Sequence, residues 1–311
     1  MQGLYTALTV PYNSNGAADE KTLIQLLDHQ TKAHVDGIVL LGSTGEGNIL
    51  EDHERDRIIQ TAVQRAKGKT QLMVCCGAPG TKRVLELVQR AEELGADSIL
   101  AVTPFYTKPT QEGIFQHFSA VCQATSLPIC IYNIASRTGQ NIETSTLARL
   151  AELPQIVGVK EASGSIAQVQ DVIEKITSKR SDFAVMSGDD MLTLPMIALG
   201  AHGLISVISN LLPKTTKELI TEARRQNAEA AKKIHYALKS LCAACYVESN
   251  PIPLKRMLQY VGFDMGPYRL PLTAPSKAHD DVIVSTLLAN RALLEKEGLT
   301  LTPELFACTR S

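Results

Sequence analysis

The chain has 311 residues, of which 44% are hydrophobic and 20% charged, enough for one large domain or a large domain with a smaller appendage. Its 31 basic and 32 acidic residues nearly cancel, and the sequence contains no block of like charges. This balance argues against nucleic acid and anionic membranes as partners, so we expect a small-molecule ligand.

The sequence carries no signal for export or for metal binding. It has no run of 18 apolar residues, and its first six residues lack the basic flank and apolar core of a signal peptide, so we expect a cytoplasmic protein. The seven cysteines are dispersed through apolar stretches, which is typical of small buried hydrophobic residues. Cys242 and Cys245 form a CxxC within a helical, alanine-rich stretch, but no second pair accompanies them. We therefore predict neither a metal nor a cofactor.

Short apolar runs of strand length alternate with longer amphipathic segments before residue 210. Between the runs, residues 22–27, 57–63 and 84–91 place apolar side chains three and four positions apart, which indicates helices. The order predicts a strand followed by a helix, repeated eight times. The predicted strands are residues 4–10, 37–41, 71–75, 98–102, 129–132, 157–160, 184–186 and 204–207.

Continuous apolar strands indicate a parallel sheet covered on both faces, and eight such units close naturally into a TIM barrel. A doubly wound open sheet is the alternative, but neither GxGxxG nor GxxxxGK occurs where that fold would need it. Beyond residue 213 the pattern predicts helices over 216–244, 252–261 and 280–297. We expect an α/β protein: a (β/α)8 barrel with the catalytic site over residues 1–230, and a C-terminal helical region over 231–311.

Lys160 is the most informative residue, because it ends an apolar, β-branched run, IVGV, and is followed by EASG. Burying an ammonium group is costly unless it is paired or loses its proton. Burial lowers a lysine pKa, and the neutral amine is the form that condenses with a carbonyl to give an imine. The alternative is a lysine whose ammonium reaches the strand end or pairs with Glu161.

Other reactive groups follow the predicted strands at the barrel end where active sites lie. The glycine-flanked turn GSTGEG can direct backbone N–H groups and the hydroxyls of Ser43 and Thr44 at one anion, most simply a carboxylate, although it could also be only a tight connection. Tyr132 could be a core ring, or could move protons beside Lys160. Asp189 and Asp190 have no matching third ligand, so we assign them to loop and helix capping.

Several motifs make the chain resemble the dihydrodipicolinate synthase and N-acetylneuraminate lyase superfamily of class I, Schiff-base aldolases, over nearly its whole length. They are GSTGE at 42–46, TPFY at 103–106, YNIASRTG at 132–139, GVKEASG at 158–164, SGDD at 187–190, GLISV at 203–207 and NPIP at 250–253. The resemblance implies a TIM barrel in which Lys160 forms an imine with pyruvate, Ser43 and Thr44 hold its carboxylate, and Tyr132 shuttles protons.

The resemblance also implies an assembly and a second group of site residues. Tyr106 corresponds to a tyrosine that reaches across a tight dimer interface into the neighbour's proton relay, so the site would need a homodimer, and the family commonly forms homotetramers. Gly188 and the backbone carbonyl of Ile205 correspond to positions lining the pyruvate end of the pocket. Arg137 corresponds to the arginine with which synthases hold the carboxylate of L-aspartate 4-semialdehyde.

We therefore expect an enzyme of lysine biosynthesis that joins pyruvate to L-aspartate 4-semialdehyde. The alternatives are an aldolase or lyase of the same family acting on N-acetylneuraminate or a 2-keto-3-deoxy sugar acid, which Ser43 and the GSTGE motif would suit, and a non-catalytic barrel. In relatives inhibited by lysine, a histidine, an asparagine, a glutamate and a tyrosine hold the inhibitor. The corresponding positions here are Asp52, Arg55, Pro79, Arg83 and Phe105. Arginines repel a cationic ligand, so we expect insensitivity to lysine.

Overall fold

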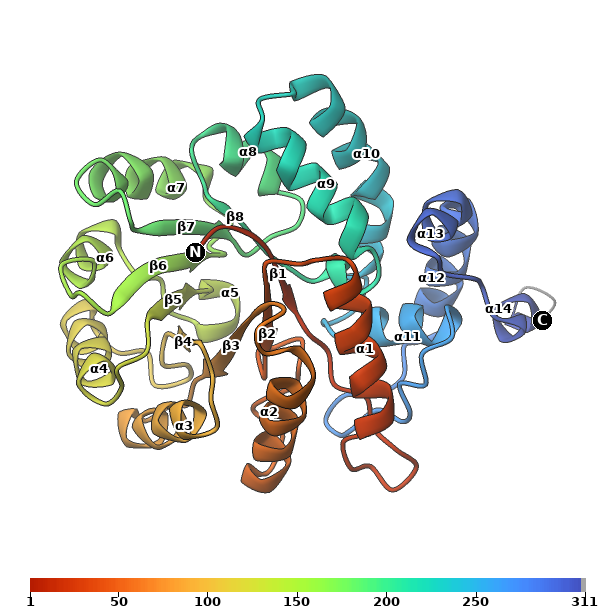
Figure 1. The fold of residues 1–311 in the computed structure, drawn as a ribbon, viewed down its shortest axis with the longest axis horizontal. Helices are drawn as coiled ribbons and strands as arrows, with labels where there is room; N and C mark the ends of the chain where they lie inside the picture. The colour runs from red at the N-terminus through yellow and green to blue at the C-terminus, as the bar shows by residue number, and fades with distance from the viewer. Residues whose placement is uncertain (309–311) are drawn as a thin grey trace.

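The computed structural model describes residues 1–308 and shows a closed barrel of eight parallel strands in the order β1 to β8 (Figure 1). The predicted TIM barrel is therefore confirmed, and the open doubly wound sheet is excluded. Each predicted strand is present, with ends that differ by up to three residues. The strands are β1 (Gly3–Ala7), β2 (Gly37–Leu40), β3 (Gln71–Cys76), β4 (Ser98–Val102), β5 (Ile129–Asn133), β6 (Ile156–Glu161), β7 (Ala184–Ser187) and β8 (Gly203–Ser206).

The strands are apolar on both faces because both faces are buried. Alternate residues, such as Met73 and Leu100, point into the barrel and form a separate apolar cluster along its axis. Their neighbours, such as Val74 and Ile99, pack outward against the surrounding helices in the main core. Successive side chains point alternately inward and outward, and both directions lead into apolar surroundings. Most residues of the strands are therefore apolar, and the strands read as continuous apolar runs in the sequence.

A ring of helices surrounds the barrel and covers its outer face (Figure 1). Capping side chains define several helix starts: Asp19, Thr110 and Ser165 each accept a hydrogen bond from a backbone N–H in the first turn. The helical elements of this part are α1 (Glu20–Lys32), α2 (Asp52–Ala66), α3 (Thr81–Glu93), α4 (Gln111–Gln123), α5 (Ala135–Thr138), α6 (Thr144–Leu150), α7 (Ile166–Val172), the π-helix η1 (Ile173–Thr177), α8 (Thr193–Ala198), the 3-10 helix η2 (Ile208–Asn210) and α9 (Pro213–Arg224).

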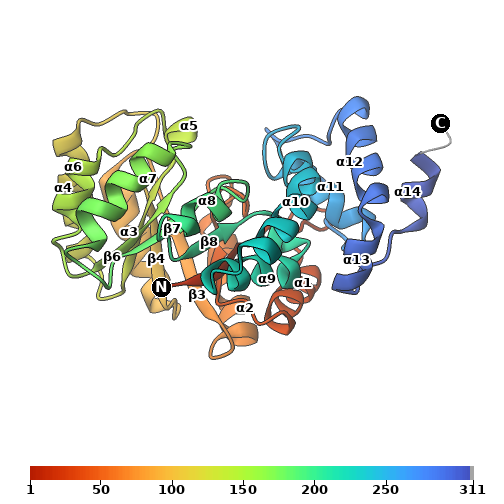
Figure 2. The ribbon, with the colours of Figure 1, turned by 90° about the horizontal axis from the view of Figure 1, so that it is seen from above.

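The C-terminal helices gather on one side of the barrel, opposite α4 and α6 (Figures 1 and 2). The sequence predicted one helix over 216–244, but Gln226 adopts a left-handed conformation with φ of 60°, which ends α9 and lets Asn227 cap the next helix. The predicted helix over 280–297 is likewise divided at Asn290. The helices are α10 (Ala228–Ala244), α11 (Ile252–Tyr260), α12 (Lys277–Ala289), α13 (Arg291–Glu297) and α14 (Pro303–Cys308).

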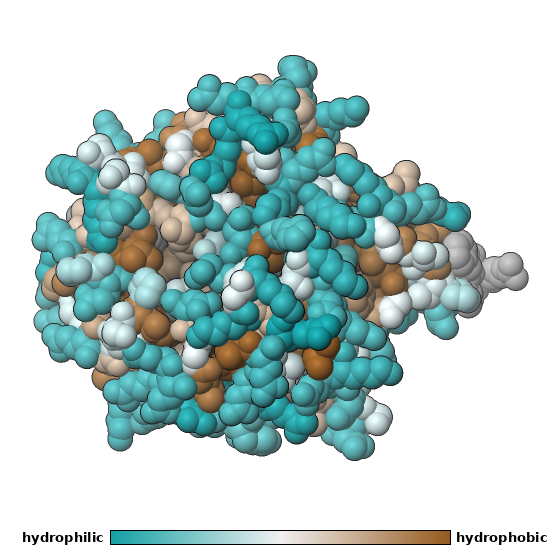
Figure 3. Space-filling model, in the orientation of Figure 1, coloured by the Kyte–Doolittle hydropathy of each residue, from teal (hydrophilic) through white to brown (hydrophobic). Residues whose placement is uncertain are grey.

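Residues 309–311 of the predicted C-terminal region, 231–311, lie outside the described residues. Within residues 1–308, none of the helices is both long enough and apolar enough to cross a bilayer. Polar side chains cover most of the face seen in Figure 3, and apolar residues appear there only in small separate patches. Six cysteines, in strands and helices alike, are free and buried, as their apolar surroundings predicted.

Candidate active site

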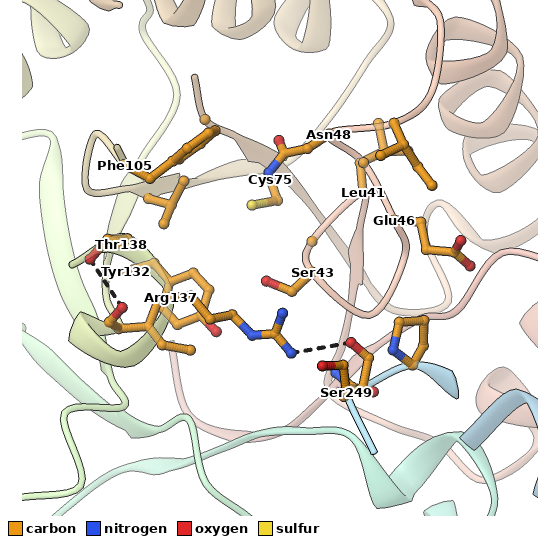
Figure 4. Close-up of a pocket in the computed structure, with 18 of the residues that line it drawn as sticks. Leu41, Ser43, Glu46, Asn48, Cys75, Phe105, Tyr132, Arg137, Thr138 and Ser249 are labelled. Atoms are coloured by element: carbon orange, nitrogen blue, oxygen red, sulfur yellow. Dashed lines mark hydrogen bonds between the residues drawn. The ribbon is translucent and has the colours of Figure 1, made fainter. Parts of the chain in front are cut away.

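Two adjoining cavities lie at the carboxyl ends of the strands, where active sites of this fold lie. Figure 4 shows the larger of the two. The outer cavity has a volume of about 320 Å³ and the inner one about 50 Å³. Lys160 lines only the inner cavity, so that cavity is the floor and the outer cavity is the mouth. Both are lined by Gly42, Ser43, Tyr132, Ile134, Arg137 and Asn250.

Lys160 occupies the position that its place in the sequence predicted. It lies next to last in β6, is only 5% exposed, and reaches the inner cavity. Strand pairing sets it directly beside Tyr132 of β5, and its Nζ lies 4.1 Å from the centre of the Tyr132 ring. The aromatic face therefore supports the amine on one side, and the phenol is near enough to serve a reaction at Nζ.

Glu161 does not pair with Lys160, because consecutive strand residues point to opposite faces. Its buried carboxylate accepts hydrogen bonds from the Asn133 side chain at 3.1 and 3.3 Å, the Ser163 backbone N–H at 2.8 Å and the Gln168 side chain at 3.2 Å. These contacts satisfy the carboxylate outside the barrel axis. The alternative of a Lys160–Glu161 ion pair is thus wrong, and the amine stays available to a ligand.

The GSTGEG turn after β2 borders both cavities. Ser43 is half-buried and lines both, whereas Thr44 is buried and lines the inner one. The side-chain amide of Asn250 donates to Thr44 Oγ1 at 2.9 Å. Since that oxygen already accepts a hydrogen bond, the Thr44 hydroxyl is free to donate its own hydrogen to a ligand in the inner cavity. The turn can therefore hold an anion.

Arg137 projects from the short helix α5 across the outer cavity toward Ser249, with Ser43 facing it (Figure 4). Its Nη2 donates to the backbone oxygen of Asn250 at 3.1 Å, which fixes the guanidinium at the mouth. The remaining N–H groups of the guanidinium are available to a carboxylate in the cavity. Arg137 thus borders both cavities, and its predicted role in holding a substrate carboxylate stays a prediction.

Asn250 is a site residue that the sequence analysis named only within a motif. It follows α10 and precedes α11, and its side chain and backbone contact Thr44 and Arg137 respectively. One residue therefore links the turn at the floor to the arginine at the mouth. The signal was present in NPIP, but only the fold shows what the asparagine contacts.

The other predicted site residues are not all brought together in one chain. Gly188 follows β7 and lines the inner cavity, close to the Lys160 side chain. Ile205 lies in β8, is 1% exposed within the axial cluster, and lines neither cavity. Tyr106 also lines neither cavity: it is 91% exposed and has a φ of 71°. Its predicted role in a neighbouring subunit stays a prediction.

Two further groups near the site have structural rather than reactive environments. Cys75 lines the outer cavity, but burial raises the pKa of its thiol to about 11, so it is protonated at neutral pH. Asp190 is buried and accepts hydrogen bonds from the Ser206 hydroxyl at 2.5 Å and the Val207 backbone N–H at 3.0 Å. Its carboxylate fixes the end of β8, which agrees with the capping role assigned to it. Among the described residues no cluster of His, Cys, Asp or Glu could hold a metal ion.

A closed (β/α)8 barrel with a buried lysine near the end of its sixth strand, beside a tyrosine and in one cavity with the Ser43–Thr44 turn, is typical of a class I aldolase scaffold. A model of the dihydrodipicolinate synthetase family matches residues 1–290. The chain belongs to this family and is an enzyme of the class I aldolase type.

Individual relatives agree with this assignment. A protein of Protochlamydia amoebophila named 4-hydroxy-tetrahydrodipicolinate synthase is 47% identical over 92% of this chain and 96% of its own length. The solved 4-hydroxy-tetrahydrodipicolinate synthase of Methylacidiphilum fumariolicum is 36% identical and superposes with a TM-score of 0.92, covering 96% of this chain and 98% of that one. A Cyanidioschyzon merolae structure, described as having lysine bound, is 34% identical with a TM-score of 0.90, covering 93% and 98%.

Proposed function

We propose that this enzyme condenses pyruvate with L-aspartate 4-semialdehyde in lysine biosynthesis, the activity for which the 47% identical relative is named. The observation that carries the proposal is the buried Lys160 amine in the inner cavity, 4.1 Å from the Tyr132 ring. The anion-binding turn beside it and Arg137 above it supply one site for each substrate carboxylate.

The first half of the reaction takes place in the inner cavity. The Lys160 amine, once it has given up its proton, attacks the keto carbon of pyruvate, while the carboxylate lies against Ser43 and Thr44. Tyr132 returns a proton to the departing hydroxyl of the carbinolamine, water leaves, and the imine forms. The small volume of this cavity suits an acid of the size of pyruvate.

The second half takes place in the outer cavity. Loss of a proton from the imine's methyl group gives an enamine, and its carbon bonds to the aldehyde carbon of the second substrate. Arg137 holds the carboxylate of that substrate, since its planar guanidinium can donate two parallel hydrogen bonds. Arg137 in the lining of the outer cavity thus favours an aldehyde that carries an acid group.

Two experiments on the purified chain test this function. Pyruvate with borohydride should add a covalent mass to the tryptic peptide that contains Lys160, and pyruvate with L-aspartate 4-semialdehyde should turn over in a coupled assay. Trapping without turnover of L-aspartate 4-semialdehyde, together with cleavage of N-acetylneuraminate or a 2-keto-3-deoxy sugar acid, would favour the lyase alternative. Ser43 in the turn is consistent with that alternative. No trapping at all would identify a non-catalytic barrel.

The partner subunit's Tyr106 completes the proton relay in this proposal, so the working unit is a homodimer, assembled further into a homotetramer. The support is the 91% exposure of Tyr106 and its left-handed φ of 71°, a strained arrangement that is retained when surroundings or function require it. Mixing inactive K160M and Y106F chains tests it. Subunit exchange should restore up to about a quarter of the native sites, because a mixed dimer has one intact site. No recovery from chains that do exchange would contradict the shared site.

Lysine should not inhibit this enzyme. Arg83 forms ion pairs with Asp52 and Glu86 on the surface, so a guanidinium stands where a cationic ligand would need acceptors. Arg55 is buried and donates to the backbone oxygens of Gly47 and Cys75. Its guanidinium offers no hydrogen-bond acceptor to the ammonium groups of a lysine ligand. Strong inhibition by lysine at millimolar concentration or below would contradict this proposal.

A further inference from the structure

The turn that holds the anion has a backbone that its own residues do not favour. Leu41 and Glu46, which bracket Ser43 and Thr44, have φ angles of 61° and 53°. Residues other than glycine seldom adopt this left-handed conformation, and they keep it only where neighbouring groups impose it. Something outside the turn must therefore hold Glu46 in place.

Contacts within the turn are too few to do so. Glu46 N–H donates to the Ser43 oxygen and Gly47 N–H to the Gly42 oxygen, both at 3.2 Å, the long end of the usual range. Gly47 lies so close to Leu41 that a Cβ on it would be 2.0 Å from the Leu41 oxygen. The turn is thus folded tightly on itself. The Ile49 N–H donates to the Glu46 oxygen at 3.0 Å and Arg55 to the Gly47 oxygen at 2.5 Å, but these bonds hold the backbone of the turn and leave the Glu46 side chain to other partners.

A restraint on the Glu46 side chain itself comes from the C-terminal helical region. Lys255 of α11 donates from Nζ to Glu46 Oε1 at 2.7 Å, and the two side chains are 1% and 2% exposed. The ring of Tyr12 supports the ammonium at 4.1 Å, and the ring of Tyr268 lies 5.7 Å away. The pair therefore joins the turn to a helix 209 residues further along the chain.

A second contact from the same segment reaches the same turn. Asn250, just before α11, donates to Thr44 Oγ1, so the segment contacts the turn on both sides of Gly45. Stability alone gives no reason for a buried ion pair, because desolvation of the two charges offsets most of their attraction and an apolar pair of similar volume would be about as stable. What an ion pair adds is one specified geometry.

We propose that the buried Glu46–Lys255 ion pair is a positioning device that keeps the Ser43–Thr44 turn in the shape that binds the keto-acid carboxylate. Neither residue lines the inner cavity, where the keto acid binds in this proposal, although Glu46 borders the outer one. They act through the backbone of the turn, and the C-terminal helical region thereby sets the affinity for pyruvate. This inference rests on the proposed function, because it assumes that pyruvate occupies the inner cavity.

The test measures borohydride trapping on Lys160 as a function of pyruvate concentration, which needs no second substrate. In E46Q and in K255M we expect the half-saturating pyruvate concentration to rise about tenfold, while the maximal trapping rate changes by less than about threefold.

The matched control is E297Q. Glu297 is also a buried carboxylate of the C-terminal region, but it accepts from Thr215 at 2.6 and 2.7 Å at the start of α9. That variant should lose thermal stability without a change in half-saturation.

The double variant E46Q/K255M keeps the test decisive if a single variant fails to fold. Removing both charges should restore folding, because no unpaired charge stays buried, but the half-saturating concentration should stay about as high as in the single variants. Native half-saturation in a folded single or double variant would overturn the inference. Failure of the unmodified chain to be trapped by pyruvate would instead overturn the proposed function.

Discussion

Gly188 is the position at which the structure makes the sharpest prediction for catalysis. A Cβ added there would lie 2.7 Å from the Ala162 Cβ, 3.0 Å from Lys160 Cε and 3.2 Å from Lys160 Cγ. Ordinary carbon contacts are about 3.5–4.0 Å. Gly188→Ala therefore pushes against the stem of Lys160, the proposed nucleophile, and this side chain has to move by a few tenths of an ångström.

The size of the effect follows from overpacking. Extra methyl groups in a packed interior cost about 1–3 kcal/mol. If the displaced Lys160 carries this cost when the imine forms, the trapping rate at saturating pyruvate falls roughly 5- to 150-fold, since about 1.4 kcal/mol corresponds to a factor of ten. The double variant G188A/A162G removes the 2.7 Å contact but keeps both contacts to Lys160. It should therefore recover stability more fully than it recovers the trapping rate.

Borohydride trapping of the Lys160 peptide and thermal unfolding measure the two effects separately. Gly80→Ala is the matched control, because a Cβ at Gly80 meets no atom within 4 Å and its φ of −113° suits any residue. We expect G80A to trap pyruvate like the unmodified chain. A G188A protein that folds and traps pyruvate at the native rate would refute the reasoning, because Lys160 would then tolerate displacement.

Three further predictions concern binding and pH. Arg137→Met should lower kcat/KM for the aldehyde roughly 10- to 100-fold and leave pyruvate trapping unchanged; equal losses for both substrates would contradict a separate aldehyde subsite. Thr44→Val leaves the Asn250 amide without its acceptor, and we expect it to raise half-saturating pyruvate about tenfold or more in the trapping assay. Burial lowers the pKa of His117 from its ordinary 6.5 to about 4, so the neutral ring stabilises the fold above pH 6.5 and this stability is lost as pH falls toward 4. Urea unfolding should show about 2 kcal/mol more loss between pH 7 and 5 in the native chain than in H117Q; parallel curves would contradict the low pKa.

The barrel could be predicted from the sequence because its signals are local. Each strand is buried on both faces, so an apolar run of the right length marks it whatever its neighbours are. The helix breaks were missed because they depend on contacts between helices and not on a local signal. Gln226 favours helices, and the left-handed conformation that it adopts between α9 and α10 is imposed by how the two helices pack, not by its own preference.

Only those residues of the candidate site that lie at strand ends or within recognisable motifs could be predicted from the sequence. Lys160 and Tyr132 lie on adjacent strands, so their proximity followed from the barrel order. Ile205 was assigned to the pocket by resemblance, through its backbone carbonyl; its side chain packs inside the barrel, and the role of the carbonyl stays a prediction. Tyr106 is exposed in the single chain, and one sequence cannot reveal what a second copy places beside it.

The buried Glu46–Lys255 pair was beyond prediction from the sequence. Its signal was a lysine among the apolar residues of LKRML in α11, which by itself suits an exposed helix face equally well. Its partner lies 209 residues earlier in the chain, and no local pattern connects them. Long-range pairs of this kind depend on how the C-terminal helices dock, which the sequence did not indicate.

The two-chamber cavity has a consequence for the order of events during turnover. The small chamber around Lys160 adjoins the larger one, and both are bordered by Gly42, Tyr132 and Asn250. Arg137 lines both chambers, so in the proposed reaction a molecule bound to it would stand between the larger chamber and the amine. Under that proposal we expect the keto acid to bind first, and an excess of the aldehyde to compete with it.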